Sequence, residues 1–146
     1  MTTARQIMTA RPVFVREQDS VTEAARRMAV LGVGCVPVLT EDDRLSGMVT
    51  DRDIAVKVIA YGHDPGATSC GDLARREVVA IGPDEPVEDV PTVMLSHRVG
   101  RVPVVEGERL IGIVGTADLA RALPDLPVAR MLDLAPAGQL DALPVG

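Results

Sequence analysis

The chain repeats itself, and this duplication limits its fold more than any other feature of the sequence. When the 146 residues are shifted by 66 positions, apolar residues and glycines of the first half fall on like residues of the second half, and beyond the turn near residue 43 the shift becomes 65. The matched residues are Val33-Gly34 with Val99-Gly100, Val36-Pro37-Val38 with Val102-Pro103-Val104, Arg44-Leu45 with Arg109-Leu110, and Gly47, Val49 and Asp53 with Gly112, Val114 and Asp118. The chain is therefore expected to fold as two copies of one supersecondary unit.

Each copy predicts the element order β-α-β-β-α after a short lead-in helix. In the first half we expect, in order, a lead-in helix ending at Ile7-Met8, a strand near 13–15, a helix opened by the capping box Ser20–Glu23 and closed by Gly32, a hairpin of 35–39 with 45–49, and a helix from Thr50 to about Ala60. In the second half the lead-in helix ends at Leu73-Ala74 and a strand follows near 78–81. Pro91 would break a helix interior, so this helix should start late, with Asp89 as its cap.

These elements define an α/β (α+β) fold made of two tandem repeats. We assign residues 1–60 to the first repeat, 61–70 to a linker rich in Gly, Pro and Ser, 71–123 to the second repeat and 124–146 to a tail with one short helix around 128–134. Hydrophobic residues make up 47% of the sequence, which is ample for a core.

Two duplicated motifs resemble the CBS domain, named after cystathionine β-synthase. The first is Gly-x-Val-Pro-Val, at residues 34–38 and 100–104; the second is a strand-to-helix junction with an aspartate at its end, at residues 47–54 and 112–119. The resemblance covers about residues 3–123 and is strongest to small stand-alone bacterial proteins with two repeats. It implies that the repeats pack sheet to sheet with pseudo-twofold symmetry, and that two clefts between them bind AMP, ADP, ATP or S-adenosyl compounds. It also implies a flat homodimer of two such modules.

The junction motif supplies the chemistry of the expected site. Asp53 and Asp118 can accept hydrogen bonds from ribose hydroxyls, and Thr50 can cap its helix or contact the ligand. By the resemblance, adenine would lie against the strand backbone near Val13 and Val36 in one cleft, and near Val79 and Val102 in the other.

The two expected sites differ at two positions. Cys35 stands where the second half has Arg101, whose guanidinium suits a phosphate, and Gly115 stands where the first half has Thr50. Arg52 could substitute for the missing arginine in the first site. Two alternatives remain open: Thr50 and Asp53 also form an ordinary capping box, and Arg101 is also an ordinary solvated strand residue.

Composition argues against several other classes of protein. The net charge of −6 and the near absence of aromatic residues disfavour nucleic-acid and membrane partners. No apolar stretch is long enough to span a bilayer, and the N-terminus lacks an apolar signal core. The two cysteines fit a reducing cytoplasm, with Cys35 expected in the core and Cys70 exposed in the linker.

No catalytic set and no metal cluster stand out. We expect His63 and His97 on the surface, and Asp51 with Asp53 lacks a third metal ligand. The sequence therefore predicts a cytoplasmic, non-catalytic module of signal transduction and stress response, which binds an adenine nucleotide as a regulatory ligand and acts on an unidentified protein partner. A scaffold that keeps the fold without a ligand is the alternative.

We expect a homodimer because each pair of repeats should expose apolar helix faces. The residues expected on such a face are Ala24, Met28, Ile54 and Val58.

Overall fold

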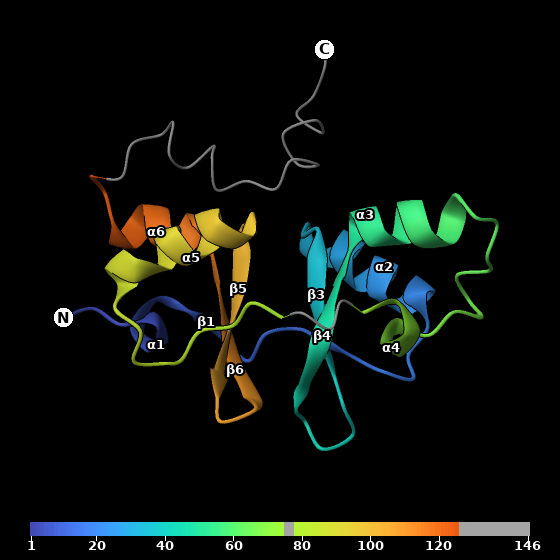
Figure 1. The fold of residues 1–146 in the computed structure, drawn as a ribbon, viewed down its shortest axis with the longest axis horizontal. Helices are drawn as coiled ribbons and strands as arrows, with labels where there is room; N and C mark the ends of the chain where they lie inside the picture. Colours follow the sequence, from blue (N-terminus) through green and yellow to red (C-terminus); the bar gives the residue numbers. More distant parts are fainter. Residues whose placement is uncertain (75–77, 126–146) are drawn as a thin grey trace, which may run out of the picture. The chain divides into compact units, whose positions relative to one another are not determined.

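The computed structural model describes residues 1–74 and 78–125 and divides the chain into two compact units. The first-repeat unit is Val13–Val78; the second-repeat unit combines Met1–Pro12 with the residues from Val79 onward. Both units are mixed α/β, as predicted (Figure 1). The tail helix expected around 128–134 lies outside the described residues.

The first-repeat unit contains a three-stranded sheet in the order β2-β3-β4. The short strand β2 (Val15–Arg16) runs parallel to β3 (Cys35–Leu39), and β3 forms an antiparallel hairpin with β4 (Leu45–Thr50). Valine dominates these strands and fills the core, as expected for β-branched side chains on a pleated surface. The predicted hairpin is confirmed.

Helix α2 (Val21–Leu31) begins and ends where the sequence predicts. The hydroxyl of Ser20 accepts a hydrogen bond from the Glu23 amide at 3.2 Å, and Gly32 closes the helix in the left-handed region at φ 67°. The Glu23 carboxylate pairs with Arg26 and Arg27. Ser20 therefore caps the helix as predicted, but the capping box is only half formed, because the Glu23 side chain pairs with the two arginines instead.

The helix after β4 has the predicted extent but a different type. Only α3 (Asp51–Asp53) is α-helical, and the next segment, η1 (Ile54–Ile59), is a π-helix. Its wider turn is closed by i→i+5 hydrogen bonds such as the one from the Ala60 amide to the Ala55 carbonyl, at 2.9 Å.

The second-repeat unit has a sheet in the order β1-β6-β5. Strand β1 (Thr9–Ala10) and strand β5 (Arg101–Glu106) both pair antiparallel with β6 (Arg109–Gly115). The strand expected near 78–81 is reduced to a single parallel bridge from Ile81 to Val104, next to β5. Ile81 is the counterpart of Val15 in β2, so the same edge position is kept with fewer residues.

The late helix start in the second repeat is confirmed. A 3-10 turn, η2 (Val87–Asp89), precedes α5 (Val90–His97), which has Asp89 at its N-cap position and Pro91 in its first turn. The final helix is α6 (Thr116–Ala122). Proline is tolerated in a first turn because its missing amide has no intrahelical partner there.

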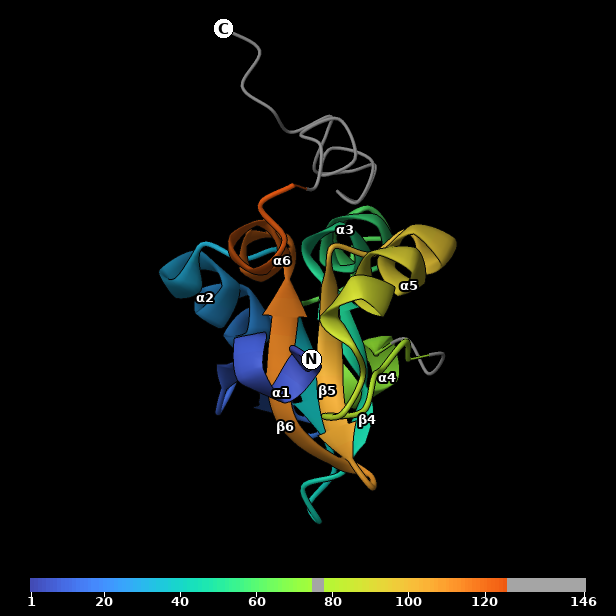
Figure 2. The same cartoon turned by 90° about the vertical axis from the view of Figure 1, so that its left-hand side faces the viewer.

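The lead-in helices occur at the predicted places, but each packs against elements of the other repeat. Helix α1 (Ala4–Ile7) packs against β6 and α6 of the second-repeat unit (Figure 2), and α4 (Cys70–Leu73) packs against α2, β2 and β4 of the first-repeat unit. Ala4 is fully buried, and its amide donates to the Glu85 carbonyl at 2.9 Å. The boundaries of the two compact units therefore differ from the boundaries of the sequence repeats.

The glycine at position 112 leaves space for the N-terminal segment to pack on β6. Strand β1 pairs with Ile113 and Gly112, and a Cβ on Gly112 would lie 2.2 Å from the Met8 sulfur. Such a distance is far inside van der Waals contact, so the Met8 side chain occupies the space that glycine leaves open.

The prediction that four apolar helix residues form an exposed dimer face is wrong. Ala24, Met28 and Val58 are buried in the core of the first-repeat unit, and Ile54 packs against that core. The same helical periodicity that marks an apolar face also marks a core face, and here it is used for the core. The large apolar side chains exposed on these helices belong instead to Val30, Leu31, Val56 and Ile59.

Within residues 1–74 and 78–125, no helix is long and apolar enough to cross a bilayer. The expected pseudo-twofold packing of the repeats concerns how the two units are placed, and it stays a prediction.

Candidate functional site

The junction between β4 and α3 buries a carboxylate. Thr50 Oγ1 accepts a hydrogen bond from the Asp53 amide at 3.0 Å, and Asp53 Oδ2 accepts one from the Thr50 amide at 3.3 Å. The Asp53 residue is only 1% exposed, and Lys57 Nζ lies 3.5 Å from its Oδ1. The capping box predicted for this position is therefore present.

The second repeat builds the same junction without the threonine. The Gly115 amide donates to Asp118 Oδ2 at 2.8 Å, and Arg121 Nη2 donates to Asp118 Oδ1. Asp118 is buried, with 8% of the residue exposed. Because the cap is made by a backbone amide, the loss of the threonine hydroxyl leaves the carboxylate in an equivalent position.

Arg101 lies beside this carboxylate on the neighbouring strand. Arg101 pairs directly with Gly115 across β5 and β6, just as Cys35 pairs with Thr50 across β3 and β4. A Cβ on Gly115 would lie 3.7 Å from Arg101 Nη1 and 3.7 Å from Asp118 Oδ2. The guanidinium and the carboxylate therefore lie next to the same bare glycine.

The Arg101 side chain carries an unused donor. Its Nε is buried and has no hydrogen-bond partner among the residues that the structure describes. A buried donor left unpaired costs roughly 1–3 kcal/mol, so an acceptor arriving at this point would relieve that cost. Arg101 is half-buried rather than fully solvated, and its contact with a phosphate stays a prediction.

The four valines expected near adenine have different environments. Val36 and Val102 are buried in β3 and β5, and Val79 packs half-buried against the core of the second-repeat unit. Val13 is 42% exposed and lines a shallow hollow on α2 together with Val30 and Leu31, rimmed by Glu23, Arg26 and Arg27. Their expected role in clefts between the repeats stays a prediction.

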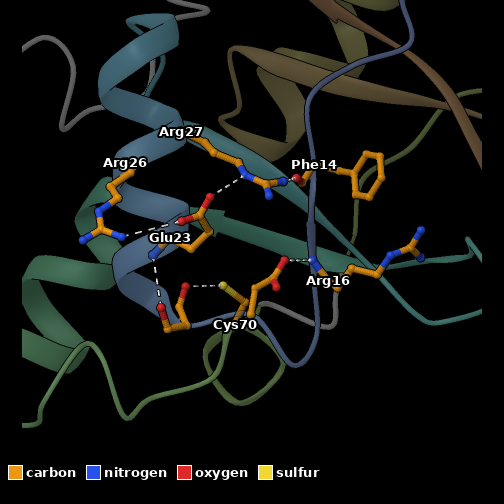
Figure 3. Close-up of polar contacts among 8 residues, drawn as sticks. Phe14, Arg16, Glu23, Arg26, Arg27 and Cys70 are labelled. Atoms are coloured by element: carbon orange, nitrogen blue, oxygen red, sulfur yellow. Dashed lines mark hydrogen bonds and ion pairs between the residues drawn. The ribbon is translucent and has the colours of Figure 1, made fainter.

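The two cysteines have the reverse of their expected exposure. Cys70, expected to be exposed, is fully buried, and its thiol donates to the Ser20 carbonyl at 3.3 Å (Figure 3). Burial, assisted by the negative charge of Asp19, raises the pKa of the Cys70 thiol to about 11. Cys35, expected in the core, is only half-buried at the start of β3. The sequence predicted the helix α4 itself, but the Gly/Pro/Ser-rich composition before Cys70 gave no sign that α4 packs against α2, β2 and β4 and so buries the thiol.

Figure 3 also shows how α2 holds the chain that leads into β2. The Arg27 guanidinium donates to the Phe14 carbonyl and pairs with Glu23, which also faces Arg26. These contacts of Arg27 hold the backbone next to Val13 against α2.

The histidines lie on the surface, as predicted. The His63 ring lies 6.4 Å from the Tyr61 ring, measured between centroids, and His97 Nδ1 lies 3.0 Å from the Val93 carbonyl oxygen. Among residues 1–74 and 78–125, no three His, Cys, Asp or Glu side chains gather closely enough to hold a metal ion.

Sequence reasoning found both carboxylates but missed their cationic partners, Lys57 and Arg121. The signal was available, because Lys57 follows Asp53 by four residues and Arg121 follows Asp118 by three, and both spacings bring side chains together on a helix.

Comparison with known proteins supports the fold and the duplication. The CBS domain model matches residues 4–59 and 70–125. The chain is 42% identical to Hypoxic response protein 1 of Mycobacterium tuberculosis over 132 residues, which cover 90% of this chain and 92% of that protein. The expected likeness to small two-repeat bacterial proteins is thereby confirmed.

Solved structures show the same architecture. A crystal structure of Hypoxic Response Protein I with two coordinated zinc ions is 43% identical and covers 84% of this chain and 100% of that chain, with a TM-score of 0.78. A structure of CBSX2 in complex with AMP is 25% identical, covers 86% and 98%, and has a TM-score of 0.75. The CBS domain pair of protein MJ0100, in complex with 5′-methylthioadenosine and S-adenosyl-L-methionine, is 28% identical, covers 86% and 98%, and has a TM-score of 0.74.

Proposed function

Since the chain belongs to the family of CBS domains, with one domain in each half, we propose that it is a regulatory module that senses an adenine nucleotide. The observation that carries the proposal is the pair of buried carboxylates, Asp53 and Asp118, each held by a backbone amide where a strand turns into a helix. A carboxylate fixed in this way is ready to accept hydrogen bonds from ribose hydroxyls without reorganising.

Two further observations support an adenine ligand. The related CBSX2 and MJ0100 domain pairs hold AMP, or 5′-methylthioadenosine and S-adenosyl-L-methionine. In this chain, the unpaired Nε of Arg101 beside Asp118 offers a donor to a phosphate oxygen. We therefore favour AMP, ADP or ATP over an uncharged nucleoside, bound in clefts between the repeats with Thr50, Val13, Val36, Val79 and Val102 around it.

The role that follows is regulatory and non-catalytic. Nucleotide occupancy would change the shape or assembly of the module for a protein partner. The name of Hypoxic response protein 1 supports a place in a stress response. Cytoplasmic localisation remains a prediction from the sequence.

A homodimer is the assembly we propose. Its contact would involve the exposed side chains of Val56 and Ile59 on η1, with Tyr61 just beyond, rather than the buried set expected from the sequence. Apolar side chains exposed close together on one helical segment are typical of protein contacts.

The two zinc ions are a property of Hypoxic Response Protein I, and we propose no zinc site for this chain. The sequence has only two histidines and two cysteines, and zinc takes cysteine as the thiolate. Burial raises the pKa of the Cys70 thiol to about 11, which disfavours the thiolate that zinc would need. In the part of the chain that the structure describes, the remaining donors form no group of three.

The runner-up is a scaffold that keeps the fold without a ligand. It is favoured by the capping bonds at Thr50 and Gly115, which give both carboxylates a structural role of their own.

A thermal unfolding screen separates the two proposals. A ligand that binds only the folded state stabilises it by about 2.7 kcal/mol at 100 times its Kd. We expect AMP, ADP or ATP to raise the melting temperature and GMP to raise it less. A flat response to all adenine compounds at millimolar concentration, S-adenosylmethionine included, would favour the scaffold.

A further inference from the structure

The two buried carboxylates divide their oxygens in the same way. In each, Oδ2 accepts the amide of the residue three positions earlier, Thr50 for Asp53 and Gly115 for Asp118. In each, Oδ1 faces a cation one helical turn further on, Lys57 for Asp53 and Arg121 for Asp118.

These cations do not occupy matching positions in the two repeats. With the 65-residue shift that aligns Asp53 with Asp118, Lys57 falls on Ala122, and Arg121 falls on Val56. The pairs also differ in residue type and spacing, Lys at i+4 and Arg at i+3. The cation was therefore not copied with the rest of the repeat. Each repeat places a cation at Oδ1, but it uses a different side chain at a different position.

The cations are exposed although the carboxylates are not. The Lys57 and Arg121 side chains are 52% and 72% exposed, against 1% and 10% for the carboxylates they face. An exposed lysine or arginine keeps much of its rotamer freedom, so its charged end can turn to a new partner while the carboxylate stays fixed.

Ligand binding sets up a competition at Oδ1. Since Oδ2 is bonded to the helix amide, a ribose hydroxyl approaching the carboxylate meets the oxygen that faces the cation. A neutral nucleoside that takes this oxygen leaves the exposed cation to solvent, without an anionic partner. A nucleotide brings a phosphate that can receive the displaced cation, by a charge-assisted contact.

We propose that Lys57 and Arg121 determine specificity, by exchanging the carboxylate for a ligand phosphate and so selecting nucleotides over nucleosides. This inference rests on the proposed function and assigns its preference for a charged ligand to two further residues. It adds Lys57 and Arg121 to Arg101 as groups that face the phosphate.

Calorimetry with AMP and adenosine tests the exchange. In Lys57→Met and Arg121→Met, AMP affinity should fall by about tenfold at one site, which is the size of a lost charge-assisted contact. Adenosine affinity should stay the same or rise, because no ion pair has to be broken. Lys57→Arg should keep the wild-type preference. Arg5→Met is the matched control, because it removes an exposed ion pair, with Glu106, that involves neither carboxylate.

Lys57 also allows a direct observation, because it is the only lysine in the sequence. Reductive ¹³C-methylation keeps its charge and gives one lysine signal in the NMR spectrum, distinct from the N-terminal amine. AMP should move this signal further than adenosine does at equal occupancy, and Asp53→Asn should move it in the protein without ligand.

The outcomes separate this inference from the proposed function. If wild type binds AMP and both methionine variants keep the AMP-to-adenosine affinity ratio, the cations are helix ion pairs only, and the exchange is contradicted while the sensor stands. If wild type binds neither compound, the proposed function fails, and the exchange fails with it.

Discussion

Cys70 should make the protein lose stability at alkaline pH. Its thiol has a pKa of about 11 in the fold against an ordinary value of 9.0, chiefly because it is buried. Between these two pH values the unfolded chain has released the proton and the folded protein has kept it. Unfolding is then favoured as pH rises, and the contribution is fully present below pH 9 and lost toward pH 11. Each unit of pKa difference corresponds to about 1.4 kcal/mol, so roughly 3 kcal/mol is at stake.

Urea unfolding followed by circular dichroism, from pH 7.5 to 10.5, measures this loss in wild type and in Cys70→Ala. The variant lacks the titrating thiol, so as pH rises above about 9 the free energy of unfolding should fall in wild type but not in the variant, on top of a constant packing difference between the two. Cys35→Ala retains Cys70 and is the control, because it should keep the alkaline loss. If wild type and Cys70→Ala give parallel curves over the whole range, the thiol is not desolvated as the fold implies.

Three other predictions concern docking, ligand charge and assembly. Gly112→Ala should cost about 1–3 kcal/mol in thermal unfolding, because its Cβ would meet Met8, and adding Met8→Ala should recover part of the loss; a single variant as stable as wild type would contradict the docking of the N-terminal segment. Arg101→Ala should weaken AMP by about tenfold at one site, in a salt-dependent way, and leave adenosine unchanged; equal losses for both would make Arg101 structural. Light scattering should report twice the chain mass at micromolar concentration, and a 15.4 kDa species would argue against the homodimer.

Local signals in the sequence predicted most of the fold. The hairpins follow from two valine-rich runs around a polar turn, and Ser20, Gly32 and Pro91 mark helix ends by chemistry that acts within one turn. The carboxylates of the candidate site were found for the same reason, since each belongs to a junction of a few residues.

Features that depend on distant contacts could not be predicted in this way. Cys70 stands in a stretch whose composition is typical of an exposed linker, yet α4 packs against α2, β2 and β4 and buries it. The docking of α1 on β6 depends on a glycine about a hundred residues away. Likewise, the periodicity of Ala24 and Met28 is the same for a core face and for an exposed apolar face.

The central claim is that Asp53 and Asp118 bind the ribose of an adenine nucleotide, and calorimetric titration with AMP tests it most directly. Asp53→Asn and Asp118→Asn keep an oxygen that can accept the capping amide while removing the charge, so they separate ligand binding from helix capping. Asp51→Asn is the matched control, an exposed aspartate on the same helical turn as Asp53. We predict that wild type binds AMP, that each site variant loses affinity about tenfold or more at one site, and that the control binds as wild type does. Unchanged isotherms in both site variants, or no AMP binding by wild type at millimolar concentration, would contradict the claim.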